Sequence, residues 1–245
     1  MIRLGKHHIT IFLFLILGCG LYQGFWAQSN ADLSKQIWLD FNPSYLVKPG
    51  LKIFGDIGTR REFENDGWWR LVLRPSVQIS FGKRYEFITG IGNFYTFNEI
   101  IEDRWELRPF QGLRFTWPHG KFPLRHYIRL EERFDFNTGN WMSRNSVRLR
   151  YQFLVSHRWK ALIPGRFWQL SASGEGFLTL LGEEGQFREL SRVTVGLDRS
   201  YTFDLHIRFE LTWQQERFFF NKDDLVSDIY FRFRLYKGWK RSNDQ

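Results

Sequence analysis

The side chains best suited to chemistry in this sequence are arginines and glutamates that recur at alternate positions. Glu106 and Arg108 are two residues apart, and so are Arg129 and Glu131. Residues two apart on a β-strand point to the same face, so these groups would gather on one side of a sheet. Guanidinium and carboxylate groups form strong bidentate pairs once they are removed from water. The candidate set for one polar face is Glu106, Arg108, Arg129, Glu131, Arg133, Arg148, Arg150, Glu175 and Arg192.

Two interpretations fit this polar set. It could line a charged, anion-preferring lumen or bind an acidic solute. It could instead be a salt-bridged filling that packs the interior of a small barrel. We favour the filling, because a small barrel has a narrow interior and the glutamates neutralise much of the arginine charge.

His206 is the histidine best placed for acid–base chemistry. It follows Asp204 by two residues and precedes Glu210 by four, so a strand would put all three on one polar face. That arrangement would suit a metal ligand or the general base of a lipid-modifying enzyme. A hydrogen-bonded interior histidine is the simpler interpretation, and no serine–histidine–acid pattern accompanies it. We therefore expect no cofactor, no metal and no catalytic residue, and we add His206 and Glu210 to the polar set.

The elements that must position these groups are strands. Between residues 69 and 81, apolar side chains occupy the odd positions and mostly polar ones the even positions, which is the period of a strand with two unlike faces. The alternation recurs along the chain, and tight turns alternate with longer polar loops between the runs. Strands are predicted over 36–46, 51–61, 69–81, 85–97, 104–117, 124–136, 146–157, 167–180, 188–198, 202–215 and 226–237.

These segments predict an all-β fold, an antiparallel up-and-down transmembrane β-barrel. Single-chain bacterial barrels normally have an even number of strands, so we expect about twelve, with ten as the alternative. Runs of roughly 11–15 residues exceed the ~9–11 needed to cross a bilayer. Aromatic residues end several apolar faces, as Trp69 and Phe81 do, which suits two interfacial girdles. We expect the apolar face to meet lipid, whereas a soluble barrel would turn it inward.

Composition narrows the class of protein. The 245 residues have a mean hydropathy of −0.39, which is too polar for a bundle of membrane-spanning helices. The only cysteine is Cys19, so the rest of the chain has no disulfide and no cysteine-based metal site. The formal net charge is +9, but the basic residues are spread along the chain, so we expect no nucleic-acid partner.

Residues 1–27 have the organisation of a secretory signal peptide. Arg3 and Lys6 precede an apolar stretch over 9–17, and the small residue Ala27 precedes Gln28. We expect export and cleavage after Ala27. The remaining residues, 28–245, would form a single barrel domain in the outer membrane of a Gram-negative cell.

A spaced series of short motifs resembles a known family. The series comprises Glu106–Gln111, Tyr127–Phe134, Arg148–Tyr151, Gly174–Phe177 and Arg192–Leu197. It is similar to the "domain of unknown function 2490" family, which consists of predicted outer-membrane β-barrels of Bacteroidota-type bacteria. The resemblance covers nearly all of the chain beyond the leader, and it implies an outer-membrane barrel without implying an activity.

Together these features predict an integral outer-membrane β-barrel with a narrow, Arg/Glu-lined lumen and a structural or small-solute role. Outer-membrane lipid is its expected partner. Two alternatives stay open at this point. One is a barrel-type lipid-modifying enzyme, and the other is a soluble periplasmic β-barrel that binds an apolar ligand.

Overall fold

The computed structural model describes residues 33–63, 67–117, 122–160, 166–182, 188–218 and 225–240. The expected leader over 1–27 lies outside these ranges. All regular structure within them is β-strand, and the residues from Leu33 onward form one compact unit. Among the described segments, no helix is long and apolar enough to cross a membrane.

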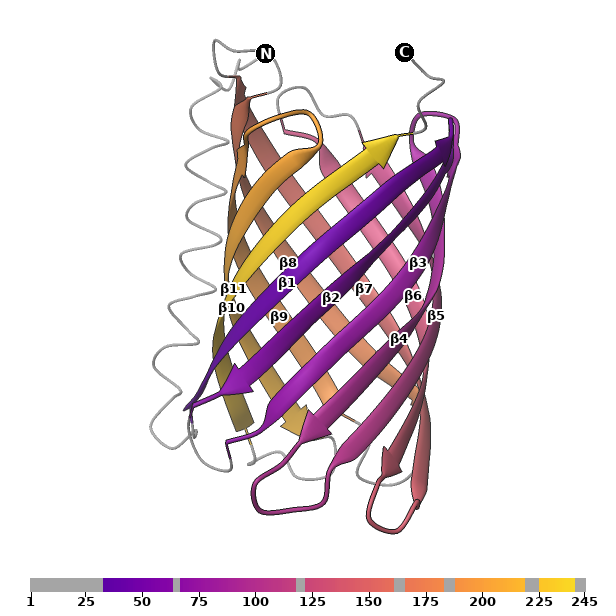
Figure 1. Cartoon of the computed structure of the whole chain (residues 1–245), viewed down its shortest axis with the longest axis vertical. Coiled ribbons are helices and arrows are strands. Elements are labelled where there is room, and N and C mark those ends of the chain that lie inside the picture. The colour runs from indigo at the N-terminus through magenta and orange to yellow at the C-terminus, as the bar shows by residue number, and fades with distance from the viewer. Residues whose placement is uncertain are drawn as a thin grey trace, which may run out of the picture. The chain divides into compact units, whose positions relative to one another are not determined.

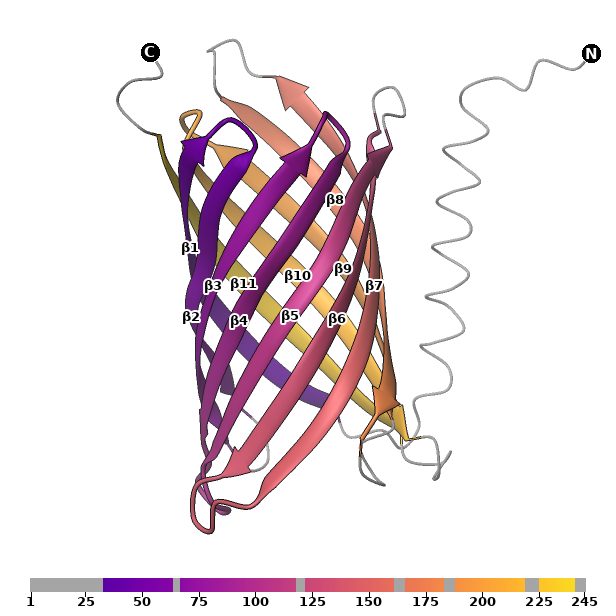
Figure 2. The same cartoon turned by 90° about the vertical axis from the view of Figure 1, so that its right-hand side faces the viewer.

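Eleven strands close into a barrel within the described residues, and each is tilted against the barrel axis (Figures 1 and 2). Their positions agree with the predicted runs, and three strands match to the residue. The strands are β1 (Leu33–Lys48), β2 (Leu51–Glu62), β3 (Trp69–Phe81), β4 (Tyr85–Phe97), β5 (Arg104–Trp117), β6 (Leu124–Asn137), β7 (Ser143–Lys160), β8 (Phe167–Leu181), β9 (Arg188–Ser200), β10 (Leu205–Phe218) and β11 (Leu225–Lys240).

The predicted all-β barrel is confirmed, and the strand number lies between the predicted twelve and the alternative ten. Neighbouring strands are antiparallel except for β1 and β11, which pair in parallel. In an up-and-down barrel with an even number of strands, the first and last strands run in opposite directions and close the barrel as an antiparallel pair. With eleven strands they run in the same direction, so the barrel closes through the parallel pairing of β1 with β11.

Side chains inside the barrel hold the β1–β11 seam. The rings of Trp38 and Tyr230 stack with their centroids 3.8 Å apart and their planes 9° apart. Arg232 donates a hydrogen bond through Nε to the carboxylate of Asp40. Stacking and a charge-assisted hydrogen bond therefore fix the register of the parallel pair.

The two faces of the barrel wall differ in chemistry. In β1, Gln36 and Asp40 are 7 % and 4 % exposed, whereas Ile37 and Leu39 between them are 41 % and 47 % exposed. The same contrast recurs around the barrel, since every strand exposes at least one large apolar side chain on the outer surface. A soluble barrel would turn its apolar face inward, whereas in the described residues the exposed large apolar side chains of these strands lie on the outer surface.

Aromatic side chains gather on the outer surface toward both ends of the barrel. We call the end with the connections 49–50, 82–84 and 201–204 the tight-turn end, which is uppermost in Figure 1, and the other the loop end. At the loop end Trp69 stacks on Phe97 and Trp105 on Phe136, with ring centroids 4.9 and 5.2 Å apart. Exposed rings at the tight-turn end include those of Tyr45, Phe81, Tyr85, Trp117, Trp159, Trp168 and Trp239.

The Asp40–Arg232 pair should carry much of the stability of the seam. Asp40→Asn keeps the side-chain shape but leaves Glu210 Oε2, 3.8 Å away, as the carboxylate nearest Arg232 among the described ion pairs. Breaking a buried pair costs roughly 3–5 kcal/mol. We expect a loss of that size in the free energy of unfolding, measured by urea titration with tryptophan fluorescence.

Glu99→Gln is the control for this measurement. Glu99 pairs with Arg61 at 3.0 Å, but the two side chains are 63 % and 48 % exposed. Exposed pairs contribute about 0–1 kcal/mol. Equal losses in the two variants would contradict a structural role for the seam pair.

Candidate functional site

Glu131 on β6 lies at the centre of the charged barrel interior, and its side chain is 0 % exposed. Arg129 contacts one carboxylate oxygen, while Arg148 donates to the other through Nε at 3.0 Å and Nη2 at 2.6 Å. Arg108 and Arg150 each place a nitrogen 3.8 Å from the carboxylate. Four arginines from three strands thus share one carboxylate, and their charges offset its removal from water.

Two further glutamates extend this cluster along the wall. Glu106 accepts hydrogen bonds from Arg108 Nη2 at 2.7 Å and from Arg133 Nε at 2.6 Å. On the other side Glu175 accepts a hydrogen bond from Arg150 Nε. We call the connected set, which runs from β5 to β9, the interior network: Glu106, Arg108, Arg129, Glu131, Arg133, Arg148, Arg150, Glu175 and Arg192. The structure therefore brings these nine predicted residues together, while what they do stays a prediction.

Aromatic rings fill the space between these charges, which the sequence pattern does not predict. The guanidinium of Arg108 lies 4.4 Å from the ring centre of Phe94, and that of Arg129 lies 4.9 Å from Phe110. Three arginines of the interior network surround Phe177 at 4.7–5.0 Å. Desolvated cation–π contacts add to the ion pairs, so the interior is packed with rings and guanidinium groups in contact.

Glycines make room for two of these rings. A Cβ added at Gly92 would come within 2.6 Å of the Phe94 ring, and one at Gly90 within 2.8 Å of the Phe110 ring. Glycine inside a strand often marks such a close approach. Sequence reasoning missed this signal. The glycines within 85–97 interrupt the alternation of side chains at positions where a neighbouring ring needs room.

A second group of ion pairs surrounds the seam, and the predicted set contains only Glu210 of it. Arg208 Nε donates to Asp198 at 2.6 Å, and Arg74 Nε donates to Asp56 at 2.7 Å. Glu210 lies 3.4–3.8 Å from three arginines. In this set, which we call the seam network, four carboxylates face four arginines: Asp40, Asp56, Arg74, Asp198, Arg208, Glu210, Arg232 and Arg234. Arg74 lies on the polar face predicted for 69–81, but the parallel pairing of β1 with β11 has no local sequence signal.

His206 lies toward the tight-turn end, against a tyrosine rather than a carboxylate. Its ring stacks on Tyr236 with centroids 4.3 Å and planes 11° apart. Asp204 bonds to Lys237, and Glu210 faces the seam arginines. In the described residues the imidazole donates no hydrogen bond to either carboxylate, and no cluster of His, Cys, Asp and Glu is suited to a metal ion. The predicted alignment of these three groups therefore does not form a base–acid pair.

A cavity of about 410 Å³ lies inside the barrel at the tight-turn end, and we call it the vestibule. At its mouth, hydrogen bonds from Lys237 and Thr202 lower the pKa of the Asp204 carboxyl to about 2. Asp204 is therefore ionised at neutral pH and neutralises Lys237. The charged side chains among the described lining residues of the vestibule are Lys52, Asp56, Arg114, Arg125, Asp204, Arg208, Arg234 and Lys237.

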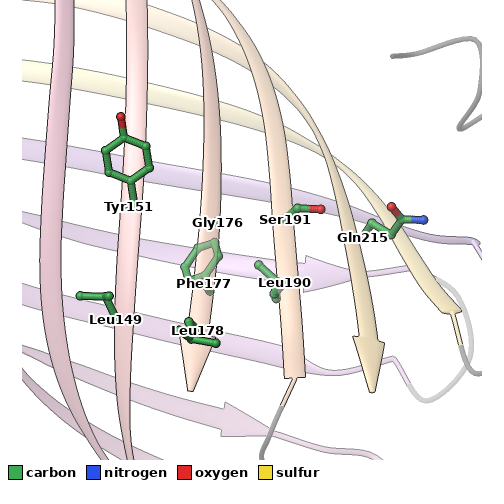
Figure 3. A pocket seen from close by; sticks show the side chains of 8 residues that line it. All are labelled: Leu149, Tyr151, Gly176, Phe177, Leu178, Leu190, Ser191 and Gln215. Atoms are coloured by element: carbon green, nitrogen blue, oxygen red, sulfur yellow. The ribbon is translucent and has the colours of Figure 1, made fainter. Parts of the chain in front are cut away.

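A second hollow, of about 510 Å³, is lined by four neighbouring strands from β7 to β10 (Figure 3). It surrounds Gly176, an exposed position at which an added Cβ would meet no atom within 4 Å. Gly176 is paired with Tyr151 on one side and Ser191 on the other. The described lining of this hollow contains no charged side chain. The hollow therefore offers contacts to apolar groups rather than acid–base chemistry.

Comparison with known proteins bears on the family rather than on an activity. Residues 35–227 match the family described as "Protein of unknown function (DUF2490)". The matched range runs from β1 into the start of β11, so it includes every residue of the interior network. No curated protein and no solved structure matches the chain.

Neutralising Glu131 should destabilise the barrel strongly. Glu131→Gln removes the charge shared by four arginines, and uncompensated buried charge costs roughly 3–5 kcal/mol. The free energy of unfolding, measured by urea titration, should fall by about that amount. Glu132→Gln is the matched control, because Glu132 is the next residue of β6 and is exposed on the opposite face. A loss in Glu132→Gln as large as in Glu131→Gln would contradict the central place of Glu131.

Proposed function

The chain belongs to the DUF2490 family of proteins of unknown function, and from that premise we propose that it is an integral outer-membrane β-barrel with a closed, charge-filled interior. Its role in this proposal is structural, as a sealed barrel in the bilayer rather than an open pore. The observation that carries the proposal is the apolar outer surface around a polar interior. Water favours the reverse arrangement, whereas lipid favours this one.

The length of the strands supports a membrane-spanning wall. β3 has 13 residues, and at ~3.3 Å per residue a strand of that length reaches ~43 Å. With the ~45° tilt of membrane barrels it spans ~30 Å, which is the thickness of the hydrocarbon core. The aromatic rings near both ends then lie at the levels of the two lipid–water interfaces.

The burial of inward-facing side chains supports a sealed interior. Side chains that line a water-filled pore keep contact with water, as in wide barrels. Glu131 on β6, Phe94 on β4 and Thr212 on β10 all point inward, and they are 0 %, 2 % and 1 % exposed. We infer that the interior network and its rings block the flow of water and ions through the middle of the barrel.

The connections suggest an orientation. Bacterial barrels turn their short connections to the periplasm and their longer loops to the cell exterior. We assign the tight-turn end to the periplasm on this ground. The vestibule then faces the periplasm, and the interior network separates it from the exterior.

Location and heat-modifiability test the proposal together. Cell membranes are extracted with carbonate, and boiled and unboiled samples are run on SDS gels. We expect the protein to stay in the outer-membrane fraction and to migrate faster when it is unboiled. Protein found free in the periplasm would overturn the proposal.

A charge placed on the outer wall should be costly only at mid-depth. Ile57 is 51 % exposed near the middle of β2, and Phe81 is 55 % exposed at the end of β3. Arginine facing lipid costs roughly 2–4 kcal/mol at the midplane and ~0–1 kcal/mol near the interface. We expect Ile57→Arg to lose that much stability in phospholipid vesicles, and Phe81→Arg to lose little. Small, equal effects would indicate a wall exposed to water.

The sealed interior also predicts electrical silence. Barrels inserted into planar bilayers should give no steady conductance, because the charged and aromatic side chains leave no continuous water path. Insertion is verified by the heat-dependent shift of the same preparation. Reproducible channel openings would contradict the sealed interior and favour a small-solute pore.

A further inference from the structure

The vestibule carries more positive than negative charge. Six of its described lining residues are cationic and two are acidic. Both acids are already engaged, because Asp56 accepts a hydrogen bond from Arg74 Nε at 2.7 Å and Asp204 bonds to Lys237. Asp56 also lies 3.6 Å from Arg234, so the two acids face the lining cations Arg234 and Lys237. They leave the other four, Lys52, Arg114, Arg125 and Arg208, without a counter-charge from the lining.

Lys52 and Arg125 are the lining cations that lack a partner. Within the described part of the chain, neither makes an ion pair or a side-chain hydrogen bond, although Lys52 Nζ lies 5.2 Å from the ring centre of Phe54. The carboxylate of Glu86 acts electrostatically on both, but it is bonded to Arg114. Two cations held in a cavity without a counter-charge favour the entry of an anion.

The shape and walls of the vestibule suit a small organic anion. Its volume of about 410 Å³ falls in the range of roughly 300–1,000 Å³ common for small-molecule sites. The stacked rings of His206 and Tyr236, together with Phe54, give it an aromatic wall. Asp56 and Arg234 of the seam network line its inner part, so a ligand would enter from the tight-turn end.

We propose that the vestibule binds a small phosphate-bearing anion through Lys52 and Arg125. A phosphate group carries up to two negative charges and several acceptor oxygens, which suits an ammonium group and a guanidinium fork acting together. A single carboxylate would neutralise only one of the two cations. The inference rests on the proposed function, because the assigned orientation exposes the vestibule to the periplasm. The same chemistry belongs to a free phosphorylated solute and to a phospholipid headgroup.

Inorganic pyrophosphate is the probe for a free solute. It is titrated into the full barrel in an uncharged detergent and followed by isothermal titration calorimetry. We expect binding to the natural protein, weakened roughly tenfold or more in K52Q/R125Q, because each lost charge-assisted hydrogen bond contributes substantially. The matched control R61Q/R104Q removes two positive charges at the loop end. It should change Kd less than about twofold, because those charges lie farther from the vestibule than the screening length.

Native mass spectrometry of the same preparations with phosphatidylglycerol tests the headgroup as the source. Selective loss of pyrophosphate binding in K52Q/R125Q supports a free solute. A headgroup is supported if the natural protein retains phosphatidylglycerol, K52Q/R125Q does not, and pyrophosphate does not bind. Binding of neither probe, or equal binding by the natural protein and K52Q/R125Q, would overturn the proposal.

Heat-modifiability, measured first for every variant, keeps the two proposals separate. Absence of the heat-dependent shift in the natural protein would count against the membrane barrel itself. Weakened binding in a variant that keeps the shift concerns the vestibule alone. Should K52Q/R125Q lose the shift, R125Q is measured against the same criteria.

Discussion

Glu131 and the four arginines around it impose the constraint on which the rest of the barrel depends. Charged side chains that are buried inside a narrow, packed β-barrel are removed from water, so they must be neutralised by one another. Glu131 has no exposed surface, and arginines from β5, β6 and β7 surround it. The rings of Phe94, Phe110 and Phe177 then occupy the space between guanidinium groups. Polar pairing and packing act here as a single core.

The same constraint sets the register of the wall. A slip of β5 by one residue would turn Glu106 and Arg108 to the outer surface and bring apolar side chains into the interior. At the seam, β1 and β11 have no hairpin to align them, and the Asp40–Arg232 bond with the Trp38–Tyr230 stack takes that part. Side chains from the first and the last strand, far apart in the sequence, therefore specify the closure of the barrel by a parallel pair.

Local periodicity predicts much of this fold. The run 69–81 reads as a strand because its two faces differ in polarity, and β3 has those bounds. The expected even strand number did not hold, because no local pattern reports that β1 and β11 run in parallel. Among the candidate residues, Glu106 to Arg192 of the interior network could be placed on one face by their spacing. Their pairing partners across strands, and the entry of Phe94 and Phe110 between them, depend on contacts distant in sequence.

The central claim is that the apolar face of the barrel wall meets lipid and the polar face lies inside. Spin-label accessibility tests this claim most directly. Cys19 is the only cysteine and lies within the expected leader, so single cysteines at 71, 72 and 73 of β3 can carry a nitroxide. Leu71 and Leu73 are 41 % and 49 % exposed on the outer wall, and Val72 is 3 % exposed inside. In phospholipid vesicles, labels at 71 and 73 should collide with oxygen and not with a water-soluble nickel complex, and a label at 72 with neither. Collision of the nickel complex with the labels at 71 and 73 would contradict a lipid-facing wall.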